Sequence, residues 1–128
     1  AMKEFKADHE LVNAFAFGPG LVVDGEKVEM RDNLWEHGVY DEPRAGIGQL
    51  DTLTYCLVAV NGREETTAGV TIEEFADIMY QLGCQQAYNL DGGNSATLVF
   101  NGEIVNEKQA EERKVLDIIY FATAADGE

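Results

Sequence analysis

The sequence is poor in positive charge. Only 9 lysines and arginines stand against 24 aspartates and glutamates in 128 residues, which gives a formal net charge of −15 at pH 7. Such a surface repels nucleic acids, anionic membranes and polyphosphates, so these are disfavoured as partners of the surface at large. An anionic substrate would need a local cluster of basic residues. The surplus of carboxylates otherwise indicates a well-solvated surface.

Cysteine and histidine are scarce as well, with two of each in the chain. They form no C-x-x-C pair and no Cys/His cluster, so the sequence predicts no zinc site. Cys56 and Cys84 each lie within an apolar segment, which is typical of buried thiols. One disulfide between them is the alternative. His9 and His37 belong to no motif, and we expect both at the surface.

Long apolar runs are also missing. No run approaches the roughly 20 residues of a transmembrane helix, so we expect no membrane insertion, and there is no signal-peptide pattern. With 128 residues, 45% of them hydrophobic, the chain has the size and composition of a single globular domain, 1–128. It contains neither internal repeats nor low-complexity segments.

Hydrophobic periodicity predicts several strands and one helix. The dipeptides Asp-Gly at 24–25 and Asn-Gly at 101–102 separate short apolar runs, which is typical of hairpins. The helix is expected from Thr71 to Leu82, with a capping box of Thr71 and Glu74 and a glycine stop at Gly83. The strands are expected at 21–23, 27–30, 43–49, 53–60, 86–90, 96–100, 103–105 and 115–123.

Two of these strands carry further information. Small residues alternate along 43–49, which suits a strand approached closely by another backbone. The 53–60 segment is apolar and rich in β-formers, which favours a central strand. The order of strands, one helix and strands predicts an α+β fold with a mixed, mostly antiparallel sheet.

The segment 89–97, Asn-Leu-Asp-Gly-Gly-Asn-Ser-Ala-Thr, contains the most polar chemistry. Gly92 and Gly93 allow positive φ and a close approach of the backbone. Asp91, Asn94 and Ser95 place a carboxylate, an amide and a hydroxyl around this turn, and successive N–H groups there can bind an anion. The same oxygens suit Ca²⁺ or Mg²⁺, so a divalent cation is an alternative. A plain hairpin turn is another alternative.

Four stretches together resemble the phosphodiester glycosidase family. They are FGPGLV with DG at 17–25, PRAGIGQ with LVAVNGR at 43–63, GVT through LGC into NLDGG at 69–93, and ERKV into IIY at 112–120. The resemblance implies a hydrolase that cleaves a sugar phosphodiester, such as an N-acetylglucosamine–phosphate linkage. Bacterial members are often described as exopolysaccharide-related, which implies carbohydrate metabolism and an extracytoplasmic or cell-surface location.

The chain departs from the family pattern in sequence and in length. Asn94 stands where members usually carry a third glycine, and Ser95-Ala96 stands where they carry a pair of Ser or Thr residues. The family domain is usually longer, with an upstream portion that nothing here matches. We therefore expect 1–128 to correspond to the C-terminal two-thirds of a longer domain. A missing N-terminal segment or a homo-oligomer would then cover exposed sheet edges.

The resemblance also assigns the main chemical roles. A phosphodiester is an anion that guanidinium groups hold well, and Arg44 and Arg113 each stand at the start of a predicted strand and within a family motif. Without the resemblance, each would be interpreted as a surface salt bridge. Cleavage of a glycosidic bond also needs a carboxylate. Asp91 is the first choice, and its alternative role is to hold the turn through nearby N–H groups.

Further substrate-binding residues are expected around the glycine turn. Its N–H groups, an amide and a hydroxyl offer donors to phosphate or sugar oxygens, and flanking side chains line the pocket if they share the face of the carboxylate. A glutamate beside Arg113 is the candidate second carboxylate. These residues are Asn89, Gly92, Gly93, Asn94, Ser95, Thr97 and Glu112.

The sequence thus predicts a glycosidase acting on a sugar phosphodiester, with a glycan or sugar-phosphate substrate and no nucleic-acid partner. The competing interpretation is a non-catalytic module that binds carbohydrate or phosphate, or an incomplete half-domain that needs a partner segment.

Overall fold

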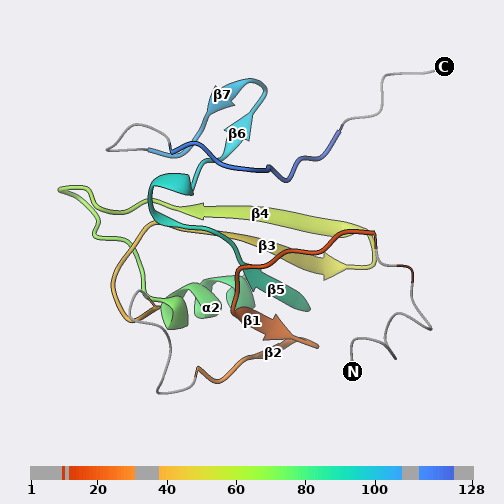
Figure 1. Cartoon of the computed structure of the whole chain (residues 1–128). Coiled ribbons are helices and arrows are strands. Elements are labelled where there is room, and N and C mark those ends of the chain that lie inside the picture. Colours follow the sequence, from red (N-terminus) through yellow and green to blue (C-terminus); the bar gives the residue numbers. More distant parts are fainter. Residues whose placement is uncertain (1–9, 11, 31–37, 108–112, 123–128) are drawn as a thin grey trace.

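A five-stranded sheet dominates the computed structural model, which describes residues 10, 12–30, 38–107 and 113–122 (Figure 1). The strands lie in the order β2-β1-β5-β3-β4, and neighbouring strands are antiparallel. One helix packs against this sheet, and β6 and β7 form a separate hairpin, so the predicted α+β class is confirmed. The elements are β1 Gly20–Val23, β2 Glu26–Lys27, β3 Arg44–Asp51, β4 Thr54–Val60, α2 Ile72–Gln81, β5 Gln86–Asn89, β6 Val99–Phe100 and β7 Glu103–Ile104.

Both predicted hairpins are present. Their turns carry successive residues with positive φ, 53° at Asp24 and 77° at Gly25 in one, and 51° at Asn101 and 82° at Gly102 in the other. This is the backbone of type I′ turns, whose twist matches that of paired strands. The turn residues therefore explain why β1 pairs with β2 and β6 with β7.

Helix α2 begins and ends at its sequence signals. The Glu74 N–H donates to Thr71 Oγ1 over 3.2 Å, and the Thr71 N–H donates to Glu74 Oε2 over 2.8 Å, which completes the predicted capping box. The Glu74 carboxylate accepts hydrogen bonds from the Thr71 N–H and, over 2.9 Å, from the Thr71 hydroxyl. These two bonds lower the pKa of Glu74, so this carboxylate acts as a cap. At the other end, Gly83 has a φ of 85° and the Cys84 N–H donates to the Met79 carbonyl oxygen, a Schellman-type stop. No helix in the described residues is long and apolar enough to cross a membrane.

The apolar face of α2 packs on the sheet and forms the core. A Cβ at Gly48 would lie 2.4 Å from Cys84 Sγ, and one at Gly46 would lie 2.9 Å from the Phe75 ring. The close backbone approach predicted for 43–49 is found only at Gly46 among these two glycines, where a Cβ would also lie 3.1 Å from the Tyr88 carbonyl oxygen. At Gly48 the neighbouring atoms belong to side chains of the core. The buried cluster consists of Leu21, Val22, Ile72, Phe75, Ala76, Met79, Cys84 and Ala87.

The two cysteines meet beside β3. Cys56 Sγ on β4 lies 3.7 Å from Cys84 Sγ, and both residues are thiols. Burial, together with the neighbouring Cys56, raises the pKa of Cys84 to about 11. The interpretation as thiols is confirmed, with Cys84 buried and Cys56 half-buried.

The prediction of a central strand at 53–60 is wrong. Within the described residues β4 pairs only with β3 and forms one edge of the sheet. The first two residues of β4 are exposed, and the other residues of the strand are half-buried. High β-propensity shows that a segment suits a pleated sheet, but it does not say how many neighbours the strand has.

The prediction of a strand at 115–123 is also wrong for the part that is described. Residues 113–122 contain no strand, and Figure 1 shows this segment passing alongside β4. The ring of Phe121 lies 6.1 Å from that of Tyr55, while Leu116 and Ile118 are exposed. The segment makes side-chain contact with β4 without a ladder of backbone hydrogen bonds, and a strand requires such a ladder.

Candidate functional site

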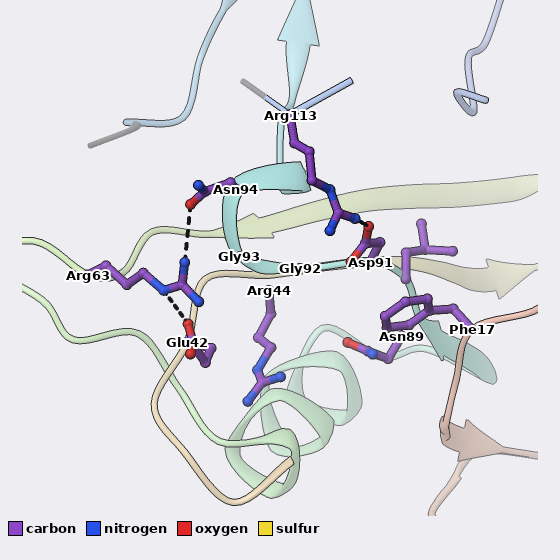
Figure 2. Close-up of a pocket in the computed structure, with 11 residues that line it drawn as sticks. Phe17, Glu42, Arg44, Arg63, Asn89, Asp91, Gly92, Gly93, Asn94 and Arg113 are labelled. Atoms are coloured by element: carbon purple, nitrogen blue, oxygen red, sulfur yellow. Dashed lines mark hydrogen bonds and ion pairs between the residues drawn. The ribbon is translucent and has the colours of Figure 1, made fainter. Parts of the chain in front are cut away.

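A pocket of about 310 Å³ opens where β5 ends and the glycine turn begins (Figure 2). The turn itself contributes residues 90–94, and Phe17 and Asn89 add an aromatic ring and an amide. The volume falls in the range of small-molecule sites, about 300–1,000 Å³. The four remaining lining residues, like Asp91 of the turn, are charged: Glu42, Arg44, Arg63 and Arg113.

The glycine turn is pressed against the start of β3. The Gly93 N–H donates to the Pro43 carbonyl oxygen over 2.8 Å, and a Cβ at Gly92 would lie 2.5 Å from that oxygen. Gly93 has a φ of 55°, and the chain then turns through a short 3₁₀ helix at Gly93–Ser95. β5 and β6 belong to different sheets, so the alternative of a plain hairpin turn is wrong. The Gly93 N–H is engaged by protein rather than directed at a ligand.

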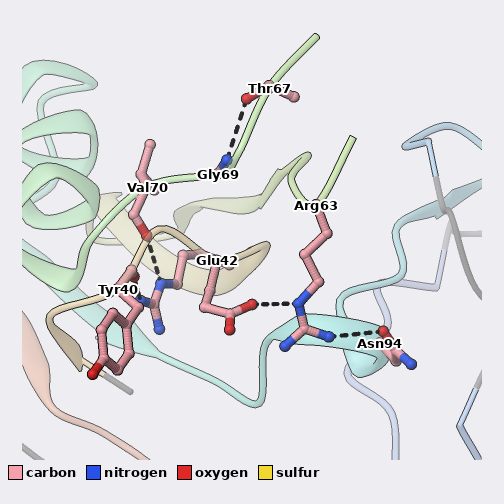
Figure 3. Close-up of polar contacts among 8 residues, drawn as sticks. Tyr40, Glu42, Arg63, Thr67, Gly69, Val70 and Asn94 are labelled. Carbon is pink, nitrogen blue, oxygen red and sulfur yellow. Dashed lines mark hydrogen bonds and ion pairs between the residues drawn. The ribbon is translucent and has the colours of Figure 1, made fainter. Parts of the chain in front are cut away.

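Arg44 lines the pocket from the first position of β3 and is only 4% exposed. Its Nε donates to the Val70 carbonyl oxygen over 2.9 Å, and its Nη2 donates to the Tyr40 carbonyl oxygen over 2.7 Å. Figure 3 shows Tyr40 and Val70. Burial lowers the pKa of Arg44, whereas the charges of Glu42 and Asp41 raise it. Arg44 thus places a buried positive charge at the pocket. Its two hydrogen bonds also connect the loop at Tyr40 with the loop at Val70.

A second arginine, Arg63, stands on the opposite side of the pocket from Asp91 in Figure 2. Its Nε lies 2.5 Å from Glu42 Oε2, and its Nη1 donates to Asn94 Oδ1 over 3.1 Å; Figure 3 shows the chain of three groups. The hydrogen bond with Glu42 raises the pKa of Arg63. The glycine turn is thereby tied to the end of β4 and the start of β3.

Sequence reasoning missed both Arg63 and Glu42 as site residues. Arg63 follows β4 and Glu42 precedes β3, and antiparallel pairing of Arg44 with Val60 brings these two strand ends together. The sequence did contain a signal for this contact. The turn between β3 and β4 is short, which favours a hairpin of these two strands. Extending that hairpin to its open end would have placed the two side chains near each other.

Asp91 and Arg113, both predicted catalytic residues, are brought together. Arg113 Nη2 donates to Asp91 Oδ2 in an ion pair, with side-chain exposures of 62% and 39%. Arg44 and Arg113 line the same pocket, as the chemistry of an anion requires. Asp91 follows β5, and Arg113 comes from a segment without regular secondary structure, so their contact joins distant parts of the chain.

The remaining predicted residues divide into two groups. Asn89, Gly92, Gly93 and Asn94 line the pocket, whereas Ser95 and Thr97 are absent from its lining. The Ser95 Oγ is buried and has no hydrogen-bond partner among the described residues. Glu112 lies outside the described residues, as do both histidines, His9 and His37.

The side chains proposed for a divalent cation do not converge on one site. The Asp91 carboxylate faces Arg113, the Asn94 amide oxygen faces Arg63, and Ser95 does not line the pocket. A guanidinium beside each oxygen disfavours a bound cation electrostatically. No group of three potential ligands from His, Cys, Asp and Glu occurs in the part of the chain that the structure describes. The pocket suits an anion better than a metal ion.

Comparison with known proteins gives relatives that are much longer than this chain. The uncharacterized SPbeta prophage-derived protein YomE of Bacillus subtilis strain 168 is 32% identical over 115 residues, which are 89% of this chain and 18% of the relative. The crystal structure of a hypothetical protein from Synechocystis matches this chain with a TM-score of 0.57 and 28% sequence identity. The match covers 70% of this chain and 17% of the Synechocystis chain. A putative exported protein from Burkholderia pseudomallei K96243 has a TM-score of 0.51 and 37% identity, covering 56% and 14%. This chain therefore spans less than a fifth of the length of each of these three relatives.

The comparison with protein families covers nearly the whole chain. A family model described as phosphodiester glycosidase matches residues 2–122, which include every residue that lines the pocket. The chain belongs to the phosphodiester glycosidase family.

Proposed function

We propose that the pocket binds a sugar phosphodiester and hydrolyses its glycosidic bond, with an N-acetylglucosamine–phosphate linkage as the type substrate. The observation that carries this proposal is the gathering of three arginines around one pocket of a protein with a net charge of −15. Two carboxylates in the lining leave the pocket with a formal charge of +1, which matches the single negative charge of a phosphodiester.

The arginines would divide the work of holding the anion. Arg63 and Arg113 have side chains that are 49% and 62% exposed, so both remain accessible from the pocket mouth. Each guanidinium has five N–H donors, and a single ion pair does not exhaust them. Arg44 is buried, and its Nε and Nη2 donate to backbone carbonyls. We therefore assign direct phosphate contacts to Arg63 and Arg113 and a supporting positive charge to Arg44.

Asp91 would supply the reacting carboxylate. In glycoside hydrolysis a carboxylate stabilises the oxocarbenium-like centre, either by attacking it or by activating water. Here the bond between the sugar carbon and the phosphate oxygen breaks, and water adds to the carbon. The products are a free sugar and a phosphate monoester.

The leaving group makes a strong general acid unnecessary. A phosphate monoester has a second pKa of about 6, so it departs as a stable anion near neutral pH. Guanidinium groups can stabilise the charge that develops on it. Glu42 joins Glu112 as a candidate second carboxylate, because Glu42 lines the pocket beside Arg63.

We also propose a cellular location and a metabolic role. One matched structure belongs to a putative exported protein, which supports an extracytoplasmic or cell-surface role in bacterial carbohydrate or exopolysaccharide metabolism.

The second candidate function is binding without catalysis, or catalysis that needs a further segment. The chain spans less than a fifth of each matched relative, and β4 is an edge among the described strands. A partner segment or a second copy in a homo-oligomer could add a strand or a catalytic group there. This candidate predicts sugar-phosphate binding without turnover by 1–128.

A hydrolysis assay on the 128-residue chain separates the two candidates. The substrates are UDP-N-acetylglucosamine and an aryl phosphodiester of N-acetylglucosamine, and released sugar is measured. Turnover of either substrate supports a complete active site. Binding without turnover favours the second candidate, and the absence of both contradicts the proposed function.

A further inference from the structure

Asn89 is the most buried polar side chain of the pocket, and one of its two polar atoms is unpaired. The residue is 1% exposed and lies at the end of β5. Its Nδ2 donates to the Gly18 carbonyl oxygen over 2.8 Å. Its Oδ1 is buried and accepts no hydrogen bond among the described residues. Buried amide oxygens are nearly always hydrogen-bonded, so the donor to this oxygen comes from outside the described residues, and a ligand or a water molecule in the pocket can supply it.

The surroundings fix which end of the amide serves the pocket. A flipped amide would set Oδ1 against the Gly18 carbonyl oxygen, two acceptors facing each other, so the hydrogen-bond network determines the orientation. The backbone is held as well: the Asn89 N–H donates to the Pro19 carbonyl oxygen over 3.0 Å, and the Gly18 N–H donates to the Asn89 carbonyl oxygen over 3.0 Å. Rotating the side chain away would break the Nδ2 contact.

A preorganised acceptor discriminates between the two halves of the proposed substrate. The oxygens of an ionised phosphodiester are acceptors only, so Oδ1 repels them. The sugar half offers hydroxyl groups and, in N-acetylglucosamine, an amide N–H, all of which can donate. Sites built around a buried hydrogen-bonding group reject analogues that lack the matching group, because the protein atom is then left unpaired.

We propose that Asn89 Oδ1 accepts a hydrogen bond from an N–H or O–H donor of the sugar ring and thereby determines sugar specificity. This inference rests on the proposed function of the same pocket. It also orients the substrate, with the sugar against Asn89 and the phosphate toward Arg63 and Arg113, which carry the accessible positive charge. Asn89 is here a specificity residue, and bond cleavage remains with Asp91.

A ligand series tests the inference on the unaltered chain. The parent ligand is the methyl ester of a C-glycosidic phosphonate of N-acetylglucosamine, which keeps the anion and cannot be hydrolysed. The analogues lack, in turn, the acetamido group at C2 or the hydroxyl at C3, C4 or C6. Isothermal titration calorimetry should show that one analogue binds about tenfold more weakly than the parent, the effect of one lost hydrogen bond, while the others bind within about threefold.

A variant then links that analogue to Asn89. Asn89→Leu has a similar volume and removes the acceptor, so the parent should lose affinity while the discriminating analogue binds no worse than the parent. Asn13→Leu changes an exposed asparagine outside the pocket lining and should reproduce the wild-type series. If Asn89→Leu does not fold, a wild-type ligand series without a discriminating analogue still overturns the inference.

The outcomes separate this inference from the function on which it rests. A parent that binds with no discriminating analogue overturns the role of Asn89, because water then satisfies the oxygen, and leaves the proposed function intact. The same discrimination in Asn89→Leu assigns the contact to another residue and also overturns it. A parent that does not bind at all contradicts the proposed function, and the inference with it.

Discussion

The two ion pairs of the pocket differ in how firmly the fold holds them. The side chain of Glu42 is 18% exposed, and its partner Arg63 also donates to Asn94. Asp91 and Arg113 are 39% and 62% exposed, and Arg113 comes from a segment without regular secondary structure. The first pair is built into the open end of the β3–β4 hairpin. The second connects the glycine turn to a segment that β4 contacts only through side chains.

This difference separates two tasks within one pocket. A side with several mutual hydrogen bonds keeps its geometry when a ligand arrives, because each group is held by more than one partner. An exposed pair gains little from its own contact and can exchange it for a ligand at low cost. We infer that the Glu42–Arg63 side shapes the site, whereas Arg113 can turn from Asp91 toward the phosphate and leave the carboxylate to react.

The largest expected effect is on catalysis by Asp91. Asp91→Asn keeps the shape and removes the charge, so kcat/KM for an aryl sugar phosphodiester should fall by about 10²–10⁴-fold. The unfolding free energy should change by less than about 0.5 kcal/mol, because the side chain is half-exposed and its ion pair with Arg113 lies at the surface. Asp117→Asn, at an exposed site outside the pocket lining, is the matched control. Equal activity of Asp91→Asn and wild type would remove Asp91 from the mechanism.

The next effect is on stability, through Arg44. Arg44→Met fills a similar space but leaves the carbonyl oxygens of Tyr40 and Val70 without these donors. We expect a loss of about 2–3 kcal/mol in the free energy of unfolding, measured in urea. Arg63→Met, at a half-exposed arginine of the same pocket, should cost about 1 kcal/mol or less. Equal losses would show that Arg44 is not the structural brace.

A smaller effect compares the two pairs directly. Arg63→Lys and Arg113→Lys keep the charge and lose the forked geometry, so each should raise KM for the phosphodiester about tenfold. Arg63→Lys should also lower the melting temperature by a few degrees, because it breaks contacts to both Glu42 and Asn94. Arg113→Lys should leave the melting temperature unchanged. A larger thermal shift in Arg113→Lys would reverse the assignment of the firm and the exchangeable side.

The smallest expected effect is that of metal removal. On both sides of the pocket an oxygen faces a guanidinium, at Asp91 with Arg113 and at Asn94 with Arg63. Treatment with EDTA should therefore leave the hydrolysis rate within about 20% of the untreated rate. Loss of activity that added Ca²⁺ or Mg²⁺ restores would show that one pair opens to admit a cation.

The parts of the fold that the sequence predicted well depend on local signals. Asp24-Gly25 and Asn101-Gly102 demand positive φ at adjacent residues, and Thr71 and Glu74 lie three residues apart in a capping box. Such features need no knowledge of distant segments. The glycine turn was identified in the same way, because its residue types alone restrict the backbone.

The parts that were missed depend on contacts between distant segments. Glu42 and Arg63 are 21 residues apart and meet only because β3 and β4 pair. The edge position of β4 reflects the order of the whole sheet, which composition does not contain. Likewise, the apolar residues of 115–122 indicated a strand, whereas the structure shows no strand there and leaves most of these residues exposed.

The most direct test of the central claim is the position of the bond that breaks. The 128-residue chain would hydrolyse an N-acetylglucosamine phosphodiester in ¹⁸O-labelled water, and mass spectrometry would locate the label. Cleavage between the sugar carbon and oxygen, as proposed here, places ¹⁸O on the sugar and none on the phosphate monoester. Label on the phosphate would mean attack at phosphorus, and it would contradict the assignment of a glycosidase with Asp91 at the sugar carbon.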